Sequence, residues 1–206
     1  YHTMTISISR PLNNNSSEND FKATKVLESL STRKPISQII RDRVIAAGDP
    51  FFANDSIAHH ISELEREELK KEIEVKLQSV FDSLVIDTAN DHNTQETAKR
   101  VAKMYVDEVF KGRYHPMPKV TDFPNAKELD EIYTLGPISV RSACSHHFVP
   151  IVGQAWIGIV PSDRVIGISK FNRIVDWVMS RPHIQEQPAI MDAYTIENLI
   201  KPKGIA

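Results

Sequence analysis

The sequence predicts an α+β protein in which helices come first and antiparallel strands with two further helices follow. Apolar residues recur at helical spacing in the first half of the chain, whereas short strand-like runs bounded by turn residues dominate the second half. We expect three parts: a remnant and flexible segment over 1–35, a helical region over 36–115 and a further domain over 116–206.

The N-terminal part carries little folding signal. Residues 1–3 precede a methionine and resemble a cloning remnant, and residues 11–20 are too polar to pack. The first helix is predicted over 37–47, where isoleucine and valine recur at helical spacing, and Asp49-Pro50 ends it.

The next segment contains adjacent histidines and a helix start. Neighbours on a helix point about 100° apart, so we expect His59 and His60 not to share a metal ion. Ser62 and Glu65 form a capping-box pattern. The helix that follows carries an apolar stripe, expected in the core or a subunit contact, of Leu69, Ile73, Leu77, Val80 and Leu84.

A further helix is predicted over 94–110, with Val101, Met104 and Tyr105 facing inward. Gly112 and the prolines after it predict a long loop. The remaining elements are predicted as strands over 131–144, 153–160 and 164–168 and helices over 170–180 and 188–200.

The only cysteine lies in a cluster with two histidines, Cys144, His146 and His147. A thiolate and imidazoles are ligands that zinc prefers. On a strand or tight turn, Cys144 and His147 would reach one ion and leave His146 free for proton transfer. A buried cysteine beside two surface histidines without a metal remains the alternative.

A helix start follows a short apolar strand, at Ser169, Lys170 and Arg173. Unpaired backbone N–H groups, the helix dipole and two cations favour phosphate there. An ordinary capped helix with solvated basic residues would give the same pattern.

This helix is expected to end near Arg181-Pro182, and Gln185 and Glu186 follow. A carboxylate beside an amide is suited to read a guanine edge. The pair alone is equally typical of a solvated surface.

Together these motifs resemble the GTP cyclohydrolase I family, from about Thr94 to the last residue of the chain. The resemblance rests on Glu96-Thr97, Arg100, Lys103–Glu108, Ser142–Pro150, Val165–Val175 and Arg181–Glu186.

The resemblance implies a role for each matched residue. Cys144 and His147 would bind zinc, and His146 would be the catalytic acid and base. Gln185 and Glu186 would hold guanine. The triphosphate would contact Ser169, Lys170 and Arg173, with Arg100 and Lys103 as further contacts across a subunit boundary.

The implied activity is hydrolysis of GTP to 7,8-dihydroneopterin triphosphate and formate, the first step of tetrahydrofolate and pterin biosynthesis. This enzyme is a hydrolase of cyclic amidine C–N bonds, with Zn²⁺ activating water for attack on the purine. The implied fold of residues 116–206 is the tunnelling fold, assembled in that family as a homodecamer with active sites between subunits.

The chain departs from the family pattern at Ala98, Ser145 and Gln187, where proline, glutamate and arginine are usual. Family members also carry a second zinc cysteine, a second catalytic histidine and a triphosphate arginine after the segment that matches 201–206. We expect the natural protein to contain that stretch.

The composition of the chain argues against several classes of protein. A net charge of −2 argues against nucleic-acid binding. No apolar run suits a membrane span or a secretory leader, and a single cysteine fits the reducing cytoplasm. Two alternatives stay open: a GTP-binding relative without catalysis, and a relative of the nitrile reductase of queuosine synthesis, which uses a cysteine nucleophile and a nicotinamide cofactor.

Overall fold

The computed structural model describes residues 34–184 and 186–206. Predictions for 1–33 and for Gln185 lie outside these residues, and residues 36–206 form one compact unit. Its helices are α2 (Ile36–Ala47), the 3₁₀ turn η1 (Ala58–His60), α3 (Glu63–Ser83), α4 (Thr97–Lys103), the π-helix η2 (Met104–Val109), α5 (Lys111–Tyr114), α6 (Ile168–Met179) and α7 (Gln187–Ile200). Its strands are β1 (Asp122–Pro124), β2 (Tyr133–Cys144), β3 (Pro150–Val160), β4 (Arg164–Ile166), β5 (Pro182–His183) and β6 (Gly204–Ile205).

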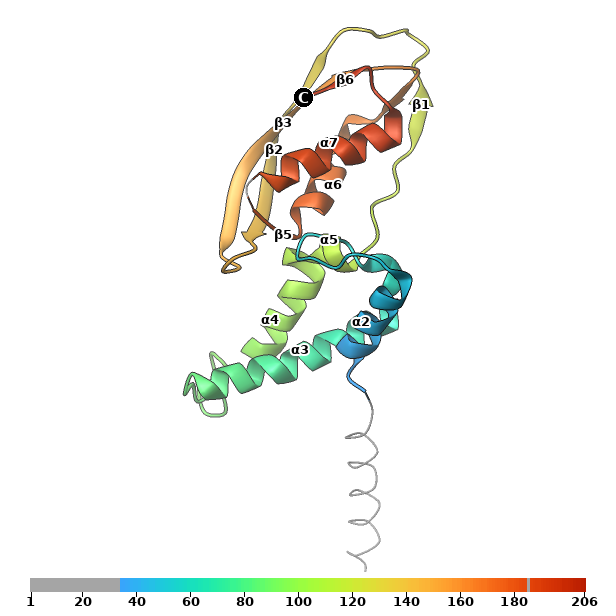
Figure 1. The fold of residues 1–206 in the computed structure, drawn as a ribbon. Coiled ribbons are helices and arrows are strands. Elements are labelled where there is room, and N and C mark those ends of the chain that lie inside the picture. The colour runs from blue at the N-terminus through green and yellow to red at the C-terminus, as the bar shows by residue number, and fades with distance from the viewer. Residues whose placement is uncertain (1–33, 185) are drawn as a thin grey trace, which may run out of the picture. The chain divides into compact units, whose positions relative to one another are not determined.

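The strands form one sheet in the order β5-β2-β3-β6 and a separate pair of β1 with β4. Strands β2 and β3 make a long antiparallel hairpin, against which α6 and α7 lie (Figure 1). Strand β5 runs parallel to β2, so the sheet is mixed rather than purely antiparallel as predicted. The α+β class is confirmed. The core between sheet and helices contains Leu135, Ile138, Val140, Ile157, Ile159, Phe171, Ile174, Val175, Val178, Ile196 and Ile200.

The N-terminal helices enclose a second, smaller core. The capping box of Ser62 and Glu65 is confirmed, since each side chain bonds the other's backbone N–H. The apolar stripe that begins on α3 is buried at Leu69 and exposed at Val80 and Leu84, so only its first part belongs to the core of this chain, and the expected subunit contact of the rest stays a prediction. The small core consists of Ile40, Val44, Ile57, Ile61 and Leu69.

The helix predicted over 94–110 changes type along its length. It is α-helical to Lys103 and π-helical over Met104–Val109, where Phe110 N–H bonds the Tyr105 carbonyl at 3.0 Å. The most buried side chains are Ala98, Ala102, Val106 and Phe110 rather than the predicted inward set, which is half-buried. Tyr105 stacks on Phe110 with ring centroids 5.1 Å apart.

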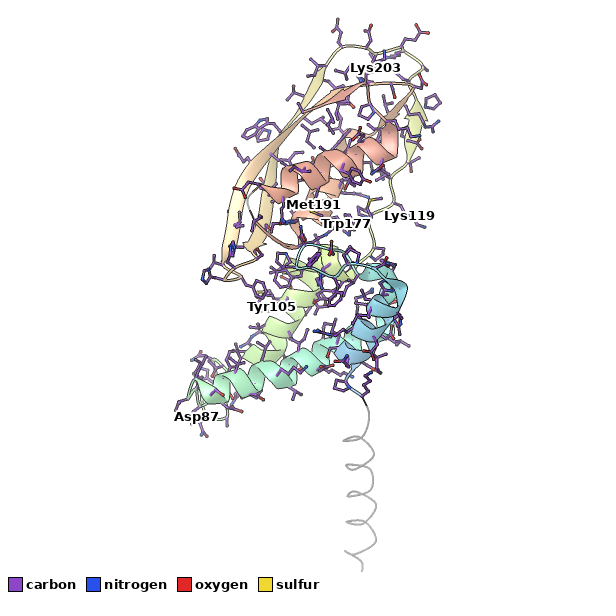
Figure 2. The ribbon with its side chains drawn as sticks, in the orientation of Figure 1. Asp87, Tyr105, Lys119, Trp177, Met191 and Lys203 are labelled. Carbon is purple, nitrogen blue, oxygen red and sulfur yellow. The ribbon has the colours of Figure 1, made fainter. Side chains whose placement is uncertain are left out.

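The short helix α5 is joined closely to the end of α6. Gly112, predicted to mark a loop, lies in α5, and its N–H donates to the Ser180 carbonyl at 2.9 Å. The guanidinium of Arg181 donates to the Gly112 carbonyl at 3.1 Å and lies over the ring of Trp177, which is labelled in Figure 2. The connection between α6 and β5 is therefore fixed by the helical region.

Asp192 on α7 is a buried carboxyl group, 8% exposed. Burial raises its pKa to about 7, although the Arg181 charge acts to lower it. In an unfolded chain an aspartate ionises near pH 3.9. Between these pH values the folded protein retains a proton that the unfolded chain has lost. This group's contribution therefore makes the free energy of unfolding fall as pH rises through that window.

We expect Asp192→Asn to remove this pH dependence. The free energy of unfolding of the wild type relative to the variant should fall by about 2 kcal/mol between pH 5 and pH 7. Urea unfolding of both proteins at each pH measures the difference, and other titrating groups cancel in it. A difference that does not change with pH would contradict the raised pKa.

Among the described residues, no helix is long and apolar enough to cross a membrane.

Candidate functional site

The hairpin turn between β2 and β3 carries the cysteine and both histidines. Cys144 is the last residue of β2 and is half-buried, whereas His146 and His147 are exposed. The turn is closed by a bond of 2.8 Å from Phe148 N–H to the Cys144 carbonyl, with Phe148 in the left-handed region at φ 56°. The loop thus presents two imidazoles at the end of the sheet.

The thiol of Cys144 lies 3.5 Å from Nδ1 of His146. The rings of His146 and His147 have centroids 6.5 Å apart. Within the described residues, the thiol's hydrogen-bond contact is therefore with His146, not with the predicted co-ligand His147. The structure therefore brings all three residues into one turn, but the thiol contacts a different histidine from the one that was predicted to share its metal ion.

Strand β5 brings the second motif to the same place. Cys144 pairs with His183 in parallel register, and Ser145 N–H donates to the His183 carbonyl at 2.9 Å. His183 is fully buried, and its Nε2 donates to the Val178 carbonyl at 2.7 Å. Burial lowers the pKa of His183, which favours the neutral ring. This ring therefore anchors the strand.

Glu186 is the N-cap of α7, three residues after the end of β5, and is exposed. Since β5 is paired with the end of β2, Glu186 lies only three residues beyond the partner of Cys144. The segment expected to hold guanine and the turn expected to bind metal thus lie next to each other, as the resemblance implies. Gln185 lies outside the described residues.

A cavity of about 450 Å³ lies between η2 and the β2–β3 hairpin. Tyr105, Lys111, Arg141 and Phe148 are among its lining residues, and Phe148 packs edge-on against Phe110 with centroids 5.3 Å apart. The motif pattern did not identify Arg141, although it lies on the same strand as Cys144. Asp107, Glu108 and Asp176 also line this cavity, so it presents cations, carboxylates and aromatic rings next to the histidine turn.

The predicted phosphate residues lie at the start of α6. Gly167 is the N-cap, so Ser169 lies inside the first turn and makes no side-chain cap. Ser169 and Arg173 are exposed and Lys170 is half-buried; within the described residues neither cation has a carboxylate partner. A helix of 12 residues is about 18 Å long, so α6 separates this cluster from β5 at its other end.

Arg100 and Lys103 lie on α4, and both are exposed. The guanidinium of Arg100 donates to the Asn93 carbonyl at 2.9 Å and to the Thr97 hydroxyl at 3.2 Å. Neither residue lines the cavity beside the histidine turn. Within one chain, the structure therefore does not gather the predicted triphosphate residues around Cys144.

The donors at the histidine turn suit zinc. A tetrahedral ion bonded to a thiolate at about 2.3 Å and an imidazole nitrogen at about 2.0 Å holds those atoms about 3.5 Å apart. The separation of Cys144 Sγ from His146 Nδ1 is 3.5 Å. The exposed ring of His147 leaves a second imidazole within the same turn.

Residues 73–206 match the profile of the family described as GTP cyclohydrolase I. A curated relative from Edwardsiella ictaluri (strain 93-146), named GTP cyclohydrolase 1, is 40% identical over 144 residues, covering 69% of this chain and 65% of that protein. Relatives of the same name are 38% identical. The match to the relative from Serratia proteamaculans (strain 568) covers 69% of this chain and 65% of that protein. The match to the relative from Yersinia enterocolitica covers 70% of this chain and 66% of that protein. The chain thus spans slightly less than two thirds of these relatives, and neither alternative function is favoured.

Proposed function

This chain belongs to the GTP cyclohydrolase I family, and we propose that it hydrolyses GTP to 7,8-dihydroneopterin triphosphate and formate. The observation that carries the proposal is the parallel pairing of Cys144 with His183. This pairing joins a turn with metal and proton-transfer groups to a segment suited to guanine. A site for attack on a purine ring needs both in one place.

The proposed roles of the chain's own groups follow from their positions. The carboxylate of Glu186 accepts hydrogen bonds from the guanine N–H and amino groups, and Gln185 reads the carbonyl edge. His146, exposed on the turn, transfers protons as water adds at C8, the imidazole ring opens and formate leaves.

The metal proposed for this site is zinc, held by Cys144 and His147, and when bound it would activate water for attack on the ring. The nearness of Cys144 to His146 makes the division of roles between the two histidines a point for experiment.

We further propose that a second copy of the chain completes the site. Of the proposed triphosphate groups, Ser169 and Lys170 lie at the opposite end of α6 from β5, and Arg173 lies about one turn further along the helix. The hairpin also exposes large apolar side chains, with Val152 79% and Trp156 57% exposed.

These features support the tunnelling fold, in which sheets of neighbouring subunits join, and a homodecamer as in the family. Arg100 and Lys103 are proposed to reach the triphosphate of a neighbouring subunit's site. The lone cysteine supports a cytoplasmic location.

The test is to incubate the full-length protein, with its zinc content quantified, with GTP and to measure formate together with the fluorescent oxidised neopterin. Both products in equal amounts are expected, and ATP should yield neither. GTP binding without either product would overturn the proposed reaction and leave a binding protein.

We expect Glu186→Ala to lower kcat/KM for GTP about 10- to 100-fold, because hydrogen bonds to a charged group contribute about 1.5–3 kcal/mol. Glu197→Ala is the matched control, since Glu197 is exposed further along the same helix. Steady-state rates with GTP measure the effect. Equal rates for the two variants would remove Glu186 from the guanine site.

A further inference from the structure

A second group of metal-type ligands lies in the N-terminal helical region, at Asp49, His59 and His60. Oδ2 of Asp49 is 3.0 Å from Nε2 of His59 and 2.8 Å from Nε2 of His60. The expectation that the adjacent rings diverge is wrong, because both side chains turn toward Asp49 and their ring centroids lie 3.9 Å apart. The group lies outside residues 73–206, which match the family.

Both backbone segments that carry these ligands are fixed. At the end of α2, Gly48 takes φ 73° and Asp49 N–H bonds the Val44 carbonyl at 3.3 Å, which places the carboxylate. On the other side, the Arg43 guanidinium bonds both the His60 carbonyl and Glu65. The ligands are therefore placed by the packing of α2 against the start of α3.

The donor set is that of a zinc site with one open position. Two imidazole nitrogens and a carboxylate oxygen, with water as fourth ligand, form a common zinc arrangement. Bonds of about 2.0–2.2 Å in tetrahedral geometry put ligand atoms about 3.3–3.6 Å apart, so an ion would need both rings to move about half an ångström away from the Asp49 oxygen. All three ligand atoms lie within 4.8 Å of one another.

Exposure and charge agree with this chemistry. The His59 side chain is 62% exposed and that of His60 8%, so one ligand is anchored while solvent reaches the other side. An aspartate carboxylate is ionised at neutral pH, as a metal ligand must be.

We propose that Asp49, His59 and His60 bind a divalent transition-metal ion of the zinc class, separately from the site at Cys144. The ion closes the loop from Asp49 to His59. That loop carries Asn54, whose carbonyl accepts a hydrogen bond of 3.2 Å from Arg181. A metal ion at this site therefore stabilises the contact between the helical region and Arg181, the residue before β5.

The test uses the full chain with Cys144→Ala, which removes the thiolate site. Equilibrium dialysis against Zn²⁺ should give one bound ion per chain. Titration with Co²⁺ should give visible d–d absorption without a thiolate charge-transfer band. Adding His59→Ala should weaken binding by more than about a hundredfold.

His92→Ala is the matched control, because His92 is an exposed histidine away from this group, and it should leave binding unchanged. Asp49→Asn should weaken metal binding as much as His59→Ala does. The second variant keeps the proposal testable if the first one fails to fold. Circular dichroism checks the fold of each. The proposal is overturned if the Cys144→Ala protein takes up no stoichiometric metal, or if neither added variant weakens its binding.

Discussion

Replacing His146 with alanine is expected to slow the release of formate from GTP by about 10²- to 10⁴-fold while the protein keeps its zinc. The imidazole is exposed on the turn after β2, where a substrate held by Glu186 would lie. Alanine leaves the turn's backbone bond from Phe148 to Cys144 intact, so the site keeps its shape. Formate release and zinc content, measured on the same preparation, test both parts of the expectation.

The matched variant is His147→Ala, for which zinc loss is expected, and with it the activity. Because Cys144 Sγ lies 3.5 Å from His146 Nδ1, comparing the two variants tests which histidine shares the metal ion with Cys144. If the His146 variant loses zinc and the His147 variant keeps it, the two proposed roles are exchanged. If both keep zinc, neither histidine is a ligand.

Gly112→Ala is expected to destabilise the fold by about 3 kcal/mol or more. A Cβ atom at this position would lie 1.8 Å from the Trp177 carbonyl oxygen and 3.1 Å from that of Ser180. Both are backbone atoms, so the end of α6 must move away from α5. That movement breaks the bonds from Gly112 N–H to Ser180 and from Arg181 to the Gly112 carbonyl.

Urea unfolding followed by circular dichroism measures this effect, and Gly153→Ala is the control. At Gly153 the nearest atom to an added Cβ is a Val140 methyl at 3.5 Å, an ordinary contact. Because α6 leads into β5, the Gly112 variant should also lose GTP turnover below its unfolding temperature. A Gly112 variant as stable as the Gly153 variant would contradict the close packing of α5 on α6.

Much of the fold could be predicted because its signals are local. The capping box at Ser62, the prolines after α2 and α6 and the apolar spacing of α6 each act within a few residues. The type of helix in η2 was not predictable, since π- and α-helices of this length share much of their apolar spacing. Nor was the mixed sheet, because two residues of β5 carry too little pattern to choose a partner strand.

For the candidate site, the sequence identified residue types but not their arrangement. Cys144 and Glu186 were expected near each other through the resemblance, and the pairing with His183 now gives the physical reason. The shared contacts of His59 and His60 with Asp49 were missed because the angle between neighbouring backbone positions does not determine where two long side chains meet. Arg141 was missed because a lone arginine on a strand has no distinguishing spacing.

The π-helical turn has a consequence for how this protein tolerates change. Tyr105 and Phe110 are five positions apart, which in an α-helix would place them about 140° apart around the axis. The π-helix stacks them instead, and Phe110 in turn supports Phe148 on the histidine turn. An ordinary α-helix over the same residues, Met104–Val109, would separate this aromatic pair. The helix type of this segment therefore determines whether Phe110 can support the histidine turn.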